Sequence, residues 1–347
     1  MRLGLAIDYA DDFAAAVQLA RGADRLGLDL VSVAEAYSFD AVSRLGYLAA
    51  VTERVGLAAT VLGAYTRSPA TLAMTAAGLD DVSGGRFELG LGASGPQVVE
   101  GFHGVPFAAP LTRLREIVEV CRMVWRREPA RLEGRTVRLP LPPEAGGTGL
   151  GKPLALVNHP VRPRIPIAIA ALTPRSVAQT AEIADGWLPA FFHPEHASAM
   201  WADALATGAA RRDPGLGPLD VHVQVPLRIG SGAAERAALA AHRARLALYV
   251  GGMGARGRNF YADVVAGFGF TDAAAEVQER FLAGDRAGAA AALPEDLVRG
   301  TSLIGDRAQV RDRWAAFADA GVTTVSVSPG GTADALDQLA TLRELTA

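Results

Sequence analysis

The stretch Gly27-Leu-Asp-Leu-Val-Ser-Val-Ala34 decides the fold, because it places a glycine directly before a short apolar run. Glycine at a helix end adopts the left-handed conformation without steric cost, so the pattern predicts a helix that ends and a strand that begins. The same pattern recurs at Gly56, Gly85, Gly186 and Gly321. Strands that are joined by single helices run parallel, because two-residue hairpins cannot connect them.

The apolar runs number about eight, which is the number of strands that closes a (β/α)8 barrel. They lie at 3–9, 28–34, 57–62, 86–91, 165–172, 187–192, 221–229 and 322–327. An open, doubly wound sheet is the structural alternative, but no linker or shift in composition divides the chain. We therefore expect one α/β TIM-barrel domain over residues 1–347.

Two stretches interrupt the alternation of strands and helices and are interpreted as insertions. Residues 131–164 are rich in Pro and Gly, which predicts a hairpin and a loop before the fifth strand. Residues 249–300 follow the seventh strand and pass from a glycine-rich segment into Ala-rich helices. Long additions to a barrel with otherwise short connections are usually lids or interfaces.

Composition excludes several classes of protein. The 37 acidic and 34 basic residues give a net charge of -3, so nucleic acid is not an expected partner. An apolar content of 50% favours a folded core. The single cysteine, Cys121, excludes an intrachain disulfide, and its helical surroundings place it in the core. No apolar run is long enough to cross a membrane, so we expect a cytoplasmic protein without a membrane partner.

The active site of such a barrel lies at the carboxyl ends of the strands. The side chains that follow the apolar runs are mostly small or apolar, which suits a flat ring system better than a sugar or a metal ion. They are Asp8, Glu35, Tyr37, residues 63–67, Ala93, Ser94, Leu172, Thr173 and residues 191–193.

Three local patterns have simpler interpretations. Gly90-Leu-Gly-Ala-Ser-Gly95 matches a dinucleotide fingerprint, but residues 96–110 are predicted to be irregular where a long helix should follow. The alternating Gly90 and Gly92 instead leave room inside the barrel mouth, and Glu88 pairs with a basic residue of another strand. His193 and His196 stand three residues apart with no third ligand in view, so no metal site is predicted.

An anion site is a further expectation at the start of the helix after the fifth strand. Thr173 is a good N-cap and Pro174 fits the first helical position, which leaves free backbone N–H groups at a positive helix end. An ordinary capped helix is the alternative interpretation.

Several stretches, taken in order, resemble the luciferase-like monooxygenase superfamily, and within it the actinobacterial oxidoreductases that use the deazaflavin coenzyme F420. The resemblance is carried by residues 33–37, 66–69, 79–97, 99–107, 184–187 and 250–256. It implies a barrel that holds the coenzyme's ring at its mouth. Among the implied features is a bulge with a non-prolyl cis peptide at Thr60, Val61, Leu62 and Gly63, against one face of the ring.

The resemblance also implies the other cofactor contacts. Ala93 and Ser94 would touch the pyrimidine end of the ring, and the phosphate-bearing tail would pass Leu172 and Thr173. Glu35 and Phe191, at the ends of their strands, complete the predicted cofactor site.

The chain departs from the superfamily's sugar-phosphate dehydrogenases, which carry an acidic residue and a histidine after strand two and a glutamate after strand four. Here these positions hold Glu35-Ala36 and Gly95. Hydride chemistry needs a group that handles the matching proton, so Asp8, Tyr37 and His103 become the candidate catalytic residues.

We therefore predict an F420-dependent reductase that transfers hydride to a small unsaturated organic substrate. The alternatives are an FMN-dependent monooxygenase on the same fold and a barrel that binds a ligand without turnover. The family is compatible with a homodimer.

Overall fold

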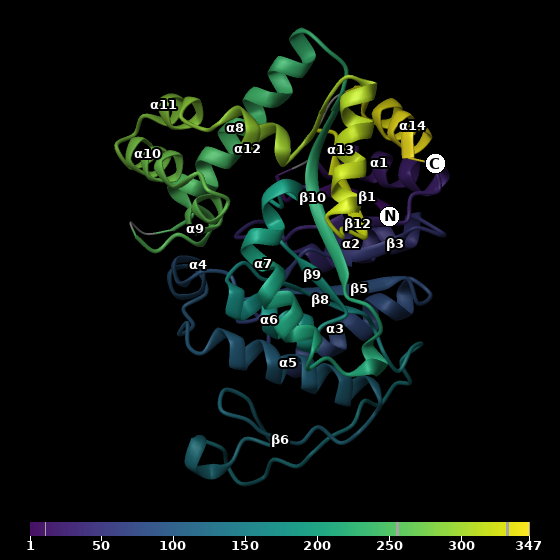
Figure 1. The fold of residues 1–347 in the computed structure, drawn as a ribbon. Helices are drawn as coiled ribbons and strands as arrows, with labels where there is room; N and C mark the ends of the chain where they lie inside the picture. Colours follow the sequence, from purple (N-terminus) through teal and green to yellow (C-terminus); the bar gives the residue numbers. More distant parts are fainter. Residues whose placement is uncertain (11, 255–256, 331–332, 347) are drawn as a thin grey trace.

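The fold is a closed barrel of parallel strands, seen in a computed structural model that describes residues 1–10, 12–254, 257–330 and 333–346. Eight strand positions close the barrel, with helices between them (Figure 1). The strands are β1 (Arg2–Ile7), β2 (Leu30–Val33), β3 (Gly56–Ala59) with β4 (Leu62–Gly63), β5 (Phe87–Gly92), β8 (Ile167–Ala170), β9 (Gly186–Leu188), β10 (Asp220–Ile229) and β12 (Thr324–Ser328). The TIM-barrel prediction is confirmed, and the open sheet is excluded because β10 pairs with both β12 and β9, which closes the circle of strands.

Two strands differ from the sequence-based prediction. The third is interrupted, because β3 and β4 are separated by Thr60 and Val61, and β4 pairs with β5. The seventh, β10, is long enough to take three partners. It pairs with β9 at its start, with β12 along its middle and with β11 (Leu303–Gly305) at its end. That extra pairing extends the sheet beyond the barrel.

Amphipathic helices cover the barrel. Those that alternate with its strands are α1 (Phe13–Arg25), α2 (Ala41–Val51), α3 (Pro69–Val82), α4 (Pro96–Gly101), α5 (Pro110–Trp125), α6 (Pro174–Ile183), α7 (Pro194–Ala209), α13 (Arg307–Asp319) and α14 (Ala335–Thr346). Their starts are set by local caps, as at Asp40, whose carboxylate accepts from the backbone N–H of Ser43. Cys121 of α5 is buried in the core, and burial raises its pKa to about 12.

The glycine rule is confirmed at three of its five positions. Gly27, Gly85 and Gly321 have φ values of 70°, 83° and 84°, which lie in the left-handed region. Gly56 and Gly186 are instead the first residues of β3 and β9, and their helices end in extended backbone at Thr52 and Ala184. At Gly56 a Cβ would lie 3.0 Å from the backbone oxygen of Asp29, so close packing explains that glycine.

The first insertion is a hairpin and loop, as predicted. It contains β6 (Leu132–Glu133), β7 (Arg138–Leu139) and the short helix η1 (Pro143–Ala145). Because it follows a helix and precedes a strand, it lies at the amino ends of the barrel strands, at the lower end of the molecule in Figure 1. It therefore cannot be a lid over the mouth.

The second insertion begins earlier than expected, because Tyr249 lies in the last turns of a helix that starts at residue 233. Its elements are α8 (Ala233–Gly252), α9 (Phe260–Gly267), α10 (Thr271–Leu282), α11 (Arg286–Ala291) and α12 (Glu295–Gly300). Residues 255–256 of the predicted glycine-rich segment lie outside the described residues. This insertion follows a strand, so it rises from the mouth of the barrel (Figure 1).

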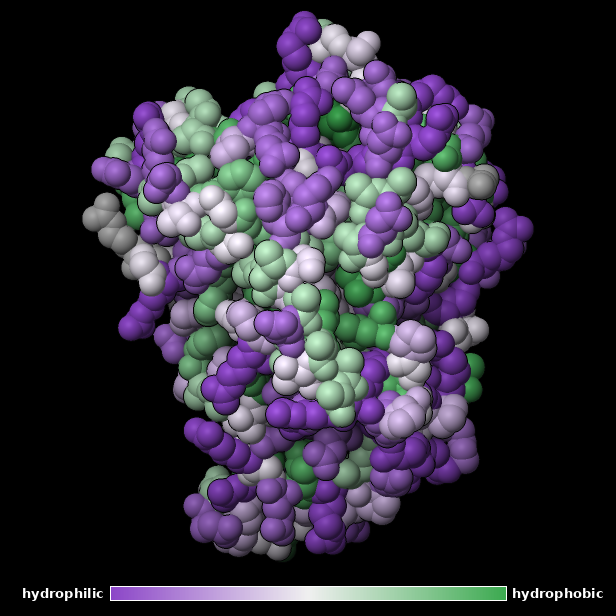
Figure 2. All heavy atoms as spheres, viewed as in Figure 1, coloured by the Kyte–Doolittle hydropathy of each residue, from purple (hydrophilic) through white to green (hydrophobic). Residues whose placement is uncertain are grey.

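One face of the molecule is polar at its periphery. Figure 2 shows hydrophilic side chains over most of the periphery of one face, with apolar groups between them near its centre. Among the described residues, no helix combines the length and apolar character that a membrane crossing requires.

Candidate active site at the barrel mouth

The barrel interior is lined toward its mouth by small and polar side chains that keep contact with solvent. Gln224 lies in the middle of β10 and is nevertheless exposed. Its amide nitrogen donates to Thr60 Oγ1 at 2.8 Å and to Ser32 Oγ at 3.3 Å. A barrel strand exposes an inward residue only where space remains above it, so the mouth is open at this level.

The interrupted third strand forms a bulge that points into this space. The peptide bond between Thr60 and Val61 is cis, at the position implied by the family resemblance. Thr60 and Val61 are both partly exposed. The bulge is seated on β5, because a Cβ on Gly90 would lie 2.0 Å from the backbone oxygen of Ala59, and one on Gly92 would lie 2.6 Å from Val61 Cγ2.

These contacts correct the prediction for the two glycines. Gly90 and Gly92 were expected to leave open room in the mouth, but the bulge fills the room that they provide. Glu88, lower on the same strand, pairs with Arg2 of β1 at 2.6 Å, which confirms the structural interpretation of that carboxylate.

The backbone after β5 turns sharply. Ser94 is exposed and has a φ of 60°, an uncommon value for a residue other than glycine. The six-residue helix α4 follows directly, so the expectation of an irregular segment over 96–110 is wrong for its first part. The helix is too short for the dinucleotide fold, and the rejection of that interpretation stands.

Two of the predicted catalytic residues lie together on the rim. Tyr37 is 56% exposed, and its ring centroid lies 6.2 Å from that of Phe102. The His103 ring meets Phe102 edge-on at 5.1 Å. The exposed Phe102 thus links the loop after β2 with the loop after α4.

The carboxylate of Glu35 accepts hydrogen bonds from two other segments of the chain. Its carboxylate receives Arg67 in two hydrogen bonds of 2.7 and 2.8 Å, and the backbone N–H of Ala41 at 3.0 Å. The two side chains are largely buried. This pair fixes the loop after β2 to the loop after β4, so Glu35 acts chiefly through the position of those loops.

Asp8 belongs to a polar group at the end of β1. Its Oδ2 accepts from Arg245 of α8 at 2.8 Å. Burial, then the neighbouring Tyr249 and Asp8, raise the pKa of Tyr9 to about 12. Burial alone would lower the pKa of Arg245, but Tyr249 and Asp8 raise it above its ordinary value. At neutral pH Tyr9 is therefore a protonated phenol, and Arg245 beside it is a charged guanidinium.

Phe191 connects the end of β9 with the second insertion. Its φ of 54° is an outlier for an aromatic residue. Its ring meets Tyr249 edge-on at 5.4 Å and lies 5.6 Å from Tyr261. Burial, followed by the neighbouring Tyr249, raises the pKa of Tyr261 to about 12, so the Tyr261 phenol stays uncharged at neutral pH.

The helix start predicted at residue 173 is confirmed. Thr173 is the N-cap of α6 and accepts from the backbone N–H of Ser176 at 3.3 Å, and Pro174 is the first helical residue. The backbone oxygen of Leu172 accepts from Trp201 at 2.8 Å, which fixes the loop before the helix.

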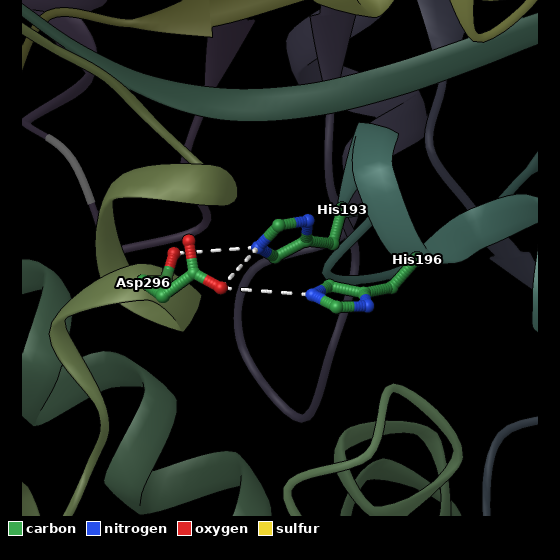
Figure 3. A group of neighbouring side chains, drawn as sticks. All are labelled: His193, His196 and Asp296. Atoms are coloured by element: carbon green, nitrogen blue, oxygen red, sulfur yellow. Dashed lines mark hydrogen bonds and ion pairs between the residues drawn. The ribbon is translucent and has the colours of Figure 1, made fainter.

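The histidine pair has the third neighbour that the sequence did not reveal. His193 and His196 of the α7 start face Asp296 of α12, with candidate ligand atoms within 4.8 Å of one another (Figure 3). No metal site was predicted from the sequence because no third ligand was in view, and this premise is wrong. Asp296 is more than 100 residues further along the chain, so no local spacing could indicate it.

Other residues that sequence reasoning missed also belong to long-range contacts. Gln224, Arg245 and Tyr249 reach the mouth from β10 and α8. A usable signal existed for one pair: Arg245 and Tyr249 are four residues apart and share a helix face. Tyr9 directly follows Asp8 and could have been named with it.

Comparisons with known proteins agree with this geometry. The model of the luciferase-like monooxygenase family matches residues 1–324. A Mycobacterium tuberculosis protein provisionally named a coenzyme F420-dependent oxidoreductase is 41% identical over 345 residues, 99% of each chain. A 5,10-methylenetetrahydromethanopterin reductase of Methanopyrus kandleri is 28% identical over 313 residues, 85% of this chain and 82% of that protein.

Solved structures share the fold. The F420-dependent tetrahydromethanopterin reductase of Methanopyrus kandleri has a TM-score of 0.81 at 23% identity, covering 99% of this chain and 97% of that chain. An F420-dependent secondary alcohol dehydrogenase has a TM-score of 0.72 at 15% identity with the same coverage. From the family match along nearly all of its length, the chain belongs to the luciferase-like monooxygenase family.

Proposed function

We propose that this protein is an F420-dependent oxidoreductase that works as a reductase on a small unsaturated organic substrate. The observation that carries the proposal is the bulge at Thr60 and Val61, seated on Gly90 and partly exposed at an open barrel mouth. The 41% identical relative, provisionally named an F420-dependent oxidoreductase, supports the choice of coenzyme.

The residues around the mouth fit a flat ring. Thr60, Val61 and Gly63 are partly exposed and offer one wall, whereas the Leu62 side chain is fully buried. Ala93 and Ser94 offer backbone groups at the end of β5. Glu35 positions the neighbouring loops, and Phe191 closes the side toward the insertion. A bound deazaflavin would supply the hydride, while the protein orients the ring and limits access of water.

The phosphate-bearing tail would run toward Leu172 and Thr173. The first backbone N–H groups of α6 have no partner within the helix, and the helix dipole places partial positive charge there. Thr173 satisfies one of them, that of Ser176. A phosphate at this helix start is thus compatible with the cap.

Hydride transfer to an unsaturated acceptor also needs a proton, and the positions of the three candidates favour different roles for them. His103 and Tyr37 lie on the rim, and imidazole is the general acid that enzymes use most often. Asp8 Oδ2 forms an ion pair with Arg245 at 2.8 Å, so Asp8 is suited to orient a substrate or to accept a proton in the reverse direction. We therefore assign proton donation to His103, with Tyr37 beside it and Asp8 as the charged partner.

The test is an anaerobic assay in which reduced F420 is mixed with the protein and a panel of enones and imines. Return of the absorbance of oxidised F420 that depends on both protein and acceptor is the expected result. Failure of every acceptor class would contradict the reductase. Protein-dependent incorporation of oxygen into a substrate with reduced FMN, in place of reduced F420, would identify a monooxygenase.

A further inference from the structure

The contact between α7 and α12 contains a group of side chains that the proposed reaction does not use. His193 and His196 come from the start of the barrel helix α7, and Asp296 comes from α12 of the second insertion (Figure 3). We propose that His193, His196 and Asp296 bind a divalent transition-metal ion of the zinc type, which fastens the insertion to the barrel.

The spacing of the ligand atoms fits such an ion. Asp296 Oδ2 lies 3.8 Å from His193 Nε2 and 3.6 Å from His196 Nε2. Two atoms that each lie about 2.1 Å from a zinc ion at the tetrahedral angle are roughly 3.4 Å apart. His196 and Asp296 keep 34% and 65% of their side-chain exposure, so they can rotate by the small amount required.

The surroundings of His193 favour ligation through Nε2. Its side chain is fully buried, and its Nδ1 lies 3.0 Å from Glu195 Oε2 without any aligned hydrogen bond. Glu195 is itself held by Arg313, with Nη1 at 2.8 Å from Oε2. His193 Nε2 lies 3.3 Å from the backbone oxygen of Asp296 and donates a hydrogen bond to it, so a metal at Nε2 would replace that bond. The carboxylate beside Nδ1 can then hold the proton of the metal-bound imidazole.

The charge of the group is also suitable. Metals bind the neutral form of imidazole, and the side chain of His193 is fully buried. The positive end of α7 opposes a cation. The carboxylates of Asp296 and Glu195 offset that effect because both lie beside the same imidazole.

Packing brings α12 close enough to supply its ligand. A Cβ on Gly300 would lie 2.0 Å from His193 Nε2, so glycine permits the helix to pass over the ring. Gly300 is four residues after Asp296 and thus lies on the same helix face. Phe268 and Phe270 contact the imidazoles from α9 and the segment after it, which surrounds the polar group with apolar side chains.

Two nitrogen ligands and one oxygen ligand, with a position left for water, suit zinc and its first-row neighbours better than calcium or magnesium. The site joins α7 of the barrel to α12, which belongs to the insertion that follows β10. We therefore expect the bound ion to stabilise the docked insertion rather than to take part in hydride chemistry, and the proposal does not depend on the coenzyme.

The experiment is a titration of the metal-free, full-length protein with zinc in competition with a chromophoric chelator, together with thermal unfolding. We expect one zinc ion per chain and a higher Tm with zinc. His196→Ala and Asp296→Ala should each weaken binding by roughly tenfold or more and abolish the Tm shift. Glu195→Gln should weaken it by about 10- to 100-fold.

Matched controls are His159→Ala in the first insertion and Asp81→Asn in α3, which change exposed residues of other elements and should leave zinc affinity unchanged. His193 itself is left unchanged, because its complete burial could make a variant fail to fold. The proposal is overturned if the metal-free protein takes up no zinc at about 100 μM free ion, or if both ligand variants bind it as the parent does.

Discussion

At the scale of single residues, a substitution of Asp8 tests most clearly what a charged side chain contributes at the barrel mouth. Asp8→Asn keeps the shape of the side chain and removes its ion pair with Arg245. We expect kcat/KM to fall by about 100-fold, as for loss of a group that acts in proton transfer or substrate orientation. F420 affinity should change little, because Asp8 is not among the proposed ring contacts.

The control for this substitution is Glu182→Gln, which breaks an ion pair of similar length with Arg115 on the outside of the barrel. It should leave kcat/KM unchanged, since surface pairs contribute only about 0–1 kcal/mol to stability. Steady-state kinetics with both variants measures the two changes in kcat/KM. Full turnover by Asp8→Asn would remove Asp8 from the site.

Single residues also show what the sequence could reveal. Asp8, Glu35 and Thr173 were found because each follows an apolar run at a strand end, and that position is local information. Arg245 and Asp296 were missed because both come from the second insertion, whose packing depends on contacts far apart in the sequence. A helix face can be predicted from spacing, but the surface that it meets cannot.

At the scale of elements, the fit between the bulge and β5 is the feature on which the cofactor site depends. In Gly90→Ala the new Cβ would lie 2.0 Å from the backbone oxygen of Ala59. Because this oxygen belongs to the backbone, it can move only if the bulge moves with it. We expect the free energy of unfolding to fall by about 1–3 kcal/mol. Coenzyme affinity should fall with it, because Thr60 and Val61 are displaced.

Gly78→Ala in α3 makes the same chemical change where nothing lies within 4 Å of the new Cβ. It should raise stability by about 0.5–1 kcal/mol and leave binding intact. Urea unfolding and a coenzyme titration on both variants measure the two effects. Equal behaviour of the two variants would show that the bulge does not depend on Gly90.

Two strand boundaries explain why the glycine rule failed at two of its positions. Gly56 and Gly186 resemble the helix-ending glycines in sequence, yet both are needed for close contact between strands. Sequence alone does not separate these two uses of glycine, because each lies directly before an apolar run.

At the scale of the whole molecule, chain order predicted the barrel and assigns each insertion to one end. The segment over 131–164 follows α5 and lies at the amino ends of the strands, whereas the helices after β10 lie at the mouth. Only the second can therefore influence which substrate reaches the coenzyme. Its contacts with Asp8 and Phe191 already join it to the proposed site.

The most direct measurement is a fluorescence titration of the apo protein with F420 and with FMN at matched concentrations. The account predicts roughly micromolar binding of F420 and an affinity for FMN at least about tenfold lower, a difference of about 1.4 kcal/mol. Tighter binding of FMN than of F420, or binding of neither, would contradict it.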